Sequence, residues 1–178
     1  GDARLVMKLP KQIRNNLRFL IAETASQVSD LQACIENPET TLARRVLERS
    51  GYAYNLMLRI QQDCHRRVIK SGDSGTETAA LKSIESIATD LEHITGLCRE
   101  SIKQLNQVQH RRCPGAGGCG DMLGRVSRGL DQVEAAIAHT DTRLALKMGR
   151  IKSRMEKTSR KLLKKYTAGL KRKKHTED

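Results

Sequence analysis

The sequence contains almost no aromatic residues: one Phe, three Tyr and no Trp among 178 residues. A core without them must be built from Leu, Ile, Val, Ala and Met, which pack readily between helices. Only three prolines occur, none of them inside a strongly periodic segment, and we find no convincing run that alternates apolar and polar residues as a strand does. The chain is therefore predicted to be all-α, an elongated antiparallel helical bundle.

The sequence also lacks long apolar runs, and its number of cysteines is odd. No segment approaches 18 consecutive apolar residues, so the sequence predicts no membrane-spanning helix, and no signal peptide is visible. The chain has five cysteines, of which Cys34, Cys64 and Cys98 fall on or beside apolar positions, where free thiols pack as small apolar groups. This usage predicts a cytoplasmic protein, either free or peripheral to the inner face of the membrane.

The net charge of +13 is concentrated in one segment. Residues 1–142 hold 19 basic and 17 acidic side chains, whereas residues 143–174 hold 14 basic side chains and one acidic side chain, Glu156. Basicity is therefore a property of the C-terminal part of the chain and not of the whole protein.

Residues 81–108 carry the clearest helical pattern. Apolar and small residues recur there at steps of three and four, in a stripe wide enough for a helix inside a bundle. We call this stripe the seam: it comprises Ile84, Ile87, Leu91, Ile94, Cys98, Ser101, Leu105 and Val108.

Similar patterns predict five helical segments, at about 10–36, 41–70 and 78–112, and then two more after residue 120. Gly51 is expected to weaken the second helix without ending it. Residues 113–120 contain four glycines and a proline, which predicts a linker. The predicted organisation is a three-helix repeat at 1–112, a Gly/Cys-rich linker at 113–120, and an incomplete second repeat at 121–178.

Few residues are arranged as a catalytic or metal site. Asp90 and His93 lie one helical turn apart, as some bundle metal ligands do, but surface charge is the favoured interpretation because no partner motif is present. His110, Cys113 and Cys119 have irregular spacing, which favours a flexible loop with two thiols over a zinc site. No Ser or Cys has a recognisable general base, and no phosphate-binding loop signature occurs. The sequence therefore predicts that the protein is not an enzyme.

The layout of long helices, together with Leu91-Glu92-His93-Ile94 in the third one, resembles the PhoU family of phosphate-signalling proteins. In that family each third helix carries a pattern close to L-E-R-I-G-D; here Leu91, Glu92 and Ile94 match, while Gly96 stands where the family has Asp. The resemblance covers residues 10–112 and, more weakly, 121–170. It implies a PhoU-like fold of three-helix repeats and a regulatory or accessory domain in phosphate transport or phosphate homeostasis.

The resemblance also implies partners and a metal. Its partners would be a transporter or a sensor kinase, with a homo-oligomer as a further alternative. Some family members bind a divalent or iron-type metal through the third-helix motif, which would make Glu92 a ligand, helped by Asp90 or His93. Because Gly96 removes the second carboxylate, we expect metal binding there to be weak or absent and no cofactor to be required.

The basic C-terminal helix supports a rival interpretation, in which the protein binds nucleic acid or an anionic membrane surface. The scarcity of aromatic residues argues against base stacking, so only weak, sequence-independent contact is expected. In the protein-contact interpretation the same cations meet an acidic partner. The basic side chains expected around this helix are Arg150, Lys152, Arg154, Lys157, Arg160, Lys161, Lys164 and Lys165.

Overall fold

The computed structural model describes residues 9–37, 42–49, 51–71, 75–107, 117–137 and 142–176, with side chains in the last helix as far as Lys165. Over these residues the chain forms helices and no strand, which confirms the prediction of an all-α bundle. The helices are α1 (Lys11–Glu36), α2 (Leu42–Glu48), α3 (Tyr52–Ser71), α4 (Gly75–Gln107), α5 (Gly117–Ala136) and α6 (Thr142–Thr176).

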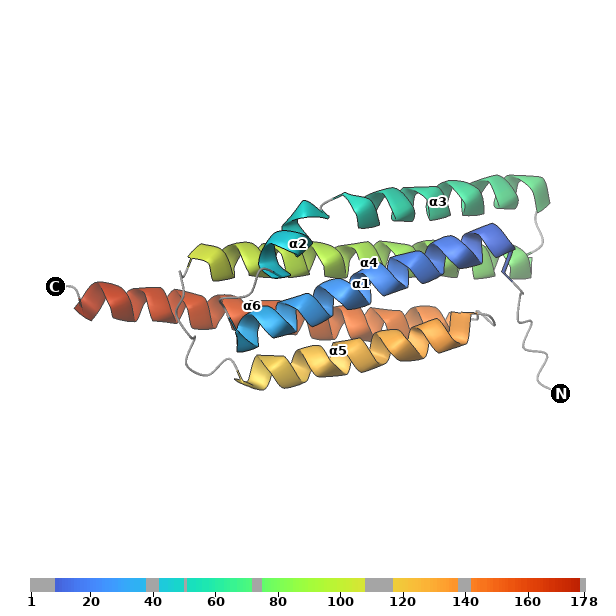
Figure 1. Ribbon diagram of the computed structural model, residues 1–178. Helices are drawn as coiled ribbons and strands as arrows, with labels where there is room; N and C mark the ends of the chain where they lie inside the picture. Colours follow the sequence, from blue (N-terminus) through green and yellow to red (C-terminus); the bar gives the residue numbers. More distant parts are fainter. Residues whose placement is uncertain are drawn as a thin grey trace.

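The long helices α1, α3, α4, α5 and α6 lie roughly parallel or antiparallel in an elongated bundle, and the short helix α2 is inclined to them (Figure 1). Helix α4 packs along α6, α3 and α1, and α1 in turn packs against α5 and α3. Buried aliphatic residues from both predicted repeats form one continuous core cluster. The C-terminal part of α6 extends beyond the ends of the other helices (Figure 1). None of the described helices combines the length and the apolar character needed to cross a membrane.

The seam on α4 is buried as predicted. Ile84, Ile87, Leu91, Ile94 and Cys98 have no exposed surface. Ser101 is also buried and its Oγ lies 3.2 Å from the Oγ of Ser159 on α6, while Leu105 is half-buried against the core. Val108 lies outside the described residues.

The prediction of one helix at 41–70 is wrong, because the helix is interrupted between α2 and α3. Gly51 has φ +93°, a left-handed conformation that residues with a Cβ rarely adopt. Its carbonyl accepts a hydrogen bond from the Asn55 amide at 3.0 Å, so Gly51 is the residue that immediately precedes α3. The apolar period continues through the break, which is why the sequence pattern indicated one helix.

Helix α5 begins inside the segment that we predicted as a linker. Its first turn is Gly117–Gly120, so glycine's poor helix propensity is overcome there by tertiary packing. Cys119 is fully buried in this turn, which corrects the prediction that it belongs to a flexible loop. His110 and Cys113, the other members of that predicted set, lie outside the described residues, and the division into two repeats stays a prediction.

Candidate functional site

Asp90 and His93, which the sequence singled out, face α6. The Asp90 carboxylate Oδ1 lies 3.5 Å from Lys152 Nζ, and His93 Nε2 lies 3.4 Å from Glu156 Oε1. The two residues are three apart on α4, so they present to the same side of the helix. They tie α4 to α6 through two cross-helix contacts, of which the second is an ion pair only when His93 is protonated.

Glu92 lies on a different side of α4. Its Oε1 is 3.7 Å from Nη2 of Arg99, two turns later on the same helix. Arg99 also donates a hydrogen bond to Thr95 Oγ1 at 3.2 Å, and the Thr95 hydroxyl donates to the Glu92 carbonyl at 2.7 Å. The motif that resembles the PhoU pattern therefore forms a local network along α4 and does not bring Glu92 toward Asp90 and His93.

The expectation that metal binding at this motif is weak or absent stays a prediction. Within the described ranges no three or more His, Cys, Asp or Glu side chains are grouped so that they could hold a metal ion. Burial raises the pKa of Asp90, and the Lys152 ammonium opposes that shift.

The predicted basic surface on α6 points away from the core. Leu144, Met148, Ile151, Met155 and Leu162 form the buried side of this helix. The opposite side exposes Arg150, Arg154, Lys157, Lys161 and Lys164, and Lys165 is half-exposed. The structure thus brings most of the predicted cations onto the solvent-facing side of a helix that is anchored by its apolar stripe, whereas Lys152 faces Asp90 of α4.

An ion-pair network between α1 and α2 was not predicted. Arg45 binds Asp30 with two contacts, Nη2 to Oδ1 at 2.6 Å and Nε to Oδ2 at 3.1 Å. Arg49 Nε donates to Glu23 Oε1 at 2.7 Å, and Gln27 Nε2 donates to the same oxygen at 3.1 Å. Asp30 and Glu23 are each only 6% exposed, so both carboxylates are buried and neutralised by arginines.

The spacing of these residues carries a signal that could have revealed the network. Glu23, Gln27 and Asp30 recur at steps of four and three, and Arg45 and Arg49 are four apart. Each set therefore lies on one face of its helix, and the charges are opposite. The sequence does not show that α2 packs back on α1, and this contact is what joins the two sets.

Exposed aromatic side chains were also missed. Phe19 is 56%, Tyr52 42% and Tyr54 49% exposed, although large aromatic residues usually pack in cores or interfaces. The Arg49 guanidinium lies over the Tyr52 ring, 4.8 Å from its centroid. Phe19 precedes Glu23 by one turn on α1, and Arg49 links Glu23 to Tyr52. We call Phe19, Arg49 and Tyr52 the aromatic surface.

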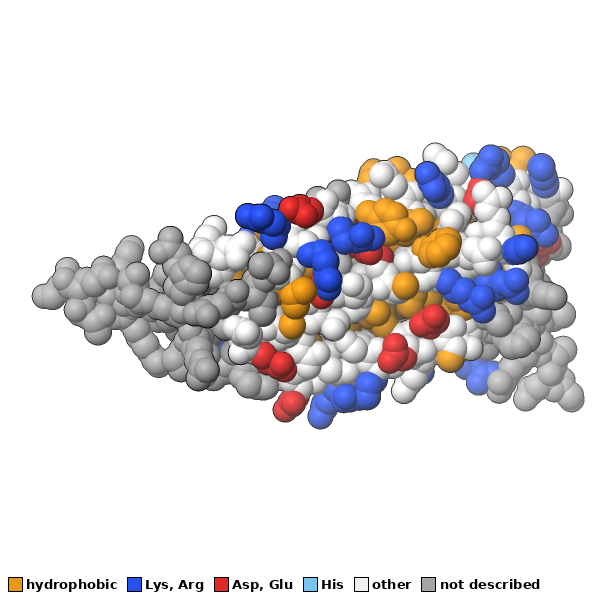
Figure 2. All heavy atoms as spheres, viewed as in Figure 1, with side chains coloured by type: hydrophobic (Ala, Val, Ile, Leu, Met, Phe, Trp, Pro, Cys, Tyr) orange, Lys and Arg blue, Asp and Glu red, His pale blue; other side chains and the backbone are white. Residues whose placement is uncertain are grey.

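Figure 2 shows hydrophobic side chains gathered over the line where α1 and α3 meet, bordered by Lys and Arg side chains. The Arg49 side chain forms an ion pair with the buried carboxylate of Glu23 and yet remains 46% exposed. An arginine fixed in this way loses less side-chain entropy when it contacts a partner. The aromatic surface therefore has the residue types of a protein contact site, and its arginine is already held in place.

The cysteines that the structure describes are buried. Cys34, Cys64, Cys98 and Cys119 have too little solvent exposure to attack a substrate. Burial raises the pKa of Cys64 and of Cys98 to about 12, so neither thiol forms a thiolate at neutral pH. The predicted role of Cys34, Cys64 and Cys98 as small apolar core residues is confirmed.

Comparison of the chain with protein-family models, with curated proteins and with solved structures found no match.

Proposed function

We propose that this protein is a PhoU-like accessory domain that regulates phosphate transport or signalling by contact with a transporter or a sensor kinase, and not by catalysis. The proposal is supported by the resemblance of residues 10–112 to the PhoU family together with the observed all-α bundle. It places the protein in the cytoplasm or at the inner face of the membrane, where such partners expose their regulatory parts.

The aromatic surface is the observation that carries this proposal. Phe, Tyr and Arg are enriched at the centres of protein interfaces, where they supply most of the binding energy. The core of this bundle is aliphatic, and Phe19 and Tyr52 are more than two-fifths exposed, so packing alone gives no reason for them. A partner segment with apolar side chains beside carboxylates would cover the rings and meet the exposed edge of Arg49.

Site-specific photocrosslinking in the native host tests this proposal. A photoreactive amino acid at Phe19 should crosslink to one defined protein partner, and the same group at Leu146 should not. Leu146 is a matched control because it is 66% exposed on α6. Equal or diffuse crosslinking at the two positions, or a partner that is unrelated to phosphate transport or sensing, would rule the proposal out.

The exposed cations of α6 favour a second candidate, a basic helical module that binds nucleic acid or an anionic membrane. They form a single-sign surface on a helix that extends past the bundle (Figure 1). For the leading proposal we expect only non-specific DNA affinity of about 10⁻⁴–10⁻⁶ M near physiological salt. Lys161→Gln, Lys164→Gln and Lys165→Gln together should abolish it without unfolding the protein. Nanomolar affinity for one DNA sequence over scrambled DNA would favour the second candidate.

A further inference from the structure

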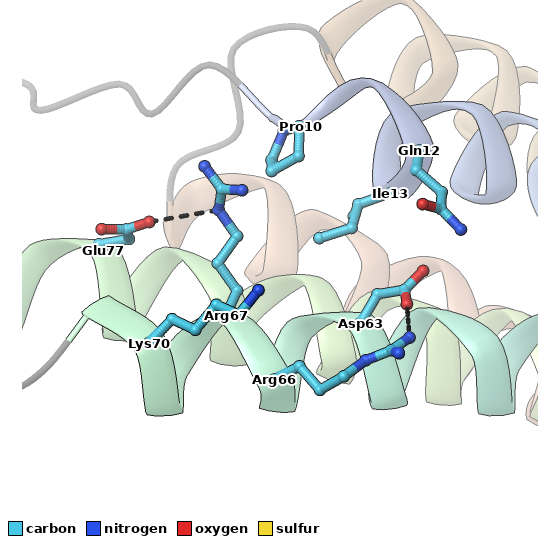
Figure 3. A pocket seen from close by; sticks show the side chains of 8 residues that line it. All are labelled: Pro10, Gln12, Ile13, Asp63, Arg66, Arg67, Lys70 and Glu77. Carbon is cyan, nitrogen blue, oxygen red and sulfur yellow. Dashed lines mark hydrogen bonds and ion pairs between the residues drawn. The ribbon is translucent and has the colours of Figure 1, made fainter.

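A cleft at one end of the bundle lies away from the aromatic surface and from α6. It has a volume of about 560 Å³ and is open to solvent between the start of α1, the end of α3 and the first turns of α4. Figure 3 shows Arg67 reaching from α3 toward Pro10 at the start of α1, with Lys70 beside it. The lining residues are Pro10, Gln12, Ile13, Asp63, Arg66, Arg67, Lys70 and Glu77.

The cations of this cleft are neutralised to different degrees. Arg66 is paired with Asp63, whose side chain is only 13% exposed. We therefore treat this pair as part of the wall of the cleft and not as a group that is available to a ligand. Arg67 Nε is 3.5 Å from Glu77 Oε1, and both side chains are substantially exposed, which makes this a weak pair. Lys70 has no carboxylate partner among the ion pairs of the described residues. Three cations thus face two carboxylates, and two of the cations can accept a new anion.

The start of α1 borders the same cleft. Pro10 precedes the helix and supplies no side-chain cap, and the first turn contains no acidic residue. The first-turn amides of a helix lack intrahelical partners and carry a partial positive charge. Pro10, Gln12 and Ile13 at the start of α1 line the same open space as Arg67 and Lys70 of α3.

We infer that this cleft binds a small polar phosphate monoester. A tetrahedral phosphate presents oxygens in several directions, which suits an Arg fork and a Lys ammonium beside the positive end of a helix. A planar carboxylate could pair both of its oxygens with Arg67 alone and would not need Lys70. The cleft is larger than a bare phosphate needs, and no aromatic residue lines it, so the organic part is a polyol or sugar and not a nucleoside base. This inference is independent of the proposed contact function.

Glu77 gives the inference a distinctive consequence. Glu77 pairs weakly with Arg67 and carries a negative charge beside the cleft, so it competes with a phosphate for the guanidinium and repels it. Glu77→Gln should therefore tighten binding, whereas Lys70→Gln and Arg67→Gln should each weaken it by about tenfold or more, as expected for the loss of a charge-assisted hydrogen bond. Opposite effects at neighbouring exposed positions are not expected from a general change in stability.

Calorimetric titration with glycerol 3-phosphate at constant ionic strength tests this inference on the full chain. Lys82→Gln on α4 and Arg59→Gln on α3 are matched controls, since both residues are exposed and neither lines the cleft. We expect saturable binding that is tightened by Glu77→Gln, weakened by Lys70→Gln and Arg67→Gln, and unchanged in the controls. Succinate should bind at least tenfold more weakly.

Three results would overturn the inference: no saturable binding, equal losses in the control variants, or binding of succinate as tight as that of glycerol 3-phosphate. Inorganic phosphate is a further probe of the anion subsite alone. It should compete with glycerol 3-phosphate, and failure to compete would show that the phosphate group is not what the cleft recognises. Circular dichroism of each variant confirms that the helices are intact.

Discussion

Leu91 illustrates how this bundle is held together without aromatic side chains. It lies in the middle of α4 with no exposed surface, among aliphatic neighbours such as Ile87 and Ile94. Burial of a Leu or Ile side chain contributes about 1.5–3 kcal/mol to the free energy of unfolding. A long row of such residues on one helix therefore provides stability that other proteins obtain from fewer and larger rings.

Leu91→Ala should lower the free energy of unfolding by about 2–5 kcal/mol, because it leaves a cavity that neighbouring aliphatic side chains fill only in part. Urea denaturation measures the change. Leu146→Ala provides the matched comparison and should change the free energy of unfolding by less than about 0.5 kcal/mol, because Leu146 is 66% exposed. Similar losses in the two variants would show that the seam is not the centre of the core.

Asp90 should give the stability of the protein a pH dependence of definite sign. Burial raises its pKa in the folded state, so the folded state holds this proton more tightly than the unfolded chain does. Stability is then lost as the pH rises from the ordinary Asp pKa of about 3.9 through the raised value. We expect the difference in unfolding free energy between wild type and Asp90→Asn to fall over that window and to be constant above it.

A pH series of urea denaturation curves measures this difference, and NMR titration of the Asp90 carboxyl carbon reports the pKa directly. Asp131→Asn on α5 is a control at an exposed position. A pKa for Asp90 below the ordinary value would mean that Lys152 outweighs burial, and the sign of the pH dependence would then be reversed.

The break between α2 and α3 shows what a short helix can add to a bundle. Helix α2 has one fully buried apolar residue, Val46, and is otherwise held by Arg45 and Arg49 on buried carboxylates of α1. This attachment brings Arg49 over Tyr52 and so completes the aromatic surface. The left-handed turn at Gly51 permits it, because a continuous helix would carry α2 away along the axis of α3.

Gly51→Ala should therefore destabilise the protein, by about 1–2 kcal/mol, because a Cβ is strained at φ +93°. Gly149→Ala should do the opposite and stabilise it by about 0.4–1 kcal/mol, since Gly149 lies inside α6 with open space around its Cα. Thermal unfolding of the two variants measures both effects. A stabilising Gly51→Ala would show that α2 and α3 join into one helix in solution.

The existence of the long helices could be predicted because apolar residues recur every three to four positions over many turns. The ends were less predictable. The glycines at 117–120 indicated a linker, but this segment forms the first turn of α5, where Cys119 packs in the core. The sequence also identified Asp90, His93 and the α6 cations as notable. It could not pair Asp90 with Lys152, since that contact depends on how α4 and α6 pack. It could not pair Arg49 with Tyr52 either, since that contact depends on the turn at Gly51, which the apolar pattern does not show.

The molecule as a whole combines one continuous core with several distinct surfaces. Helices α1 and α4 contact helices from both halves of the sequence, so the halves share buried residues. The cations of α6, the aromatic surface and the cleft at the start of α1 occupy different helices or different ends of them. Each can therefore be altered by exposed substitutions without disturbing the core, and the contributions of the surfaces can be separated experimentally.

The central proposal is regulation of phosphate transport by contact through the aromatic surface. Its most direct test is phosphate uptake by the native host, measured at low and high external phosphate, with substitutions in the native gene. We predict that Phe19→Ser combined with Tyr52→Ser abolishes the normal response of uptake to external phosphate, although the protein stays folded because both residues are exposed. The triple change Lys161→Gln, Lys164→Gln and Lys165→Gln should leave the response intact. A normal response in the aromatic variant, with loss only in the lysine variant, would contradict the account.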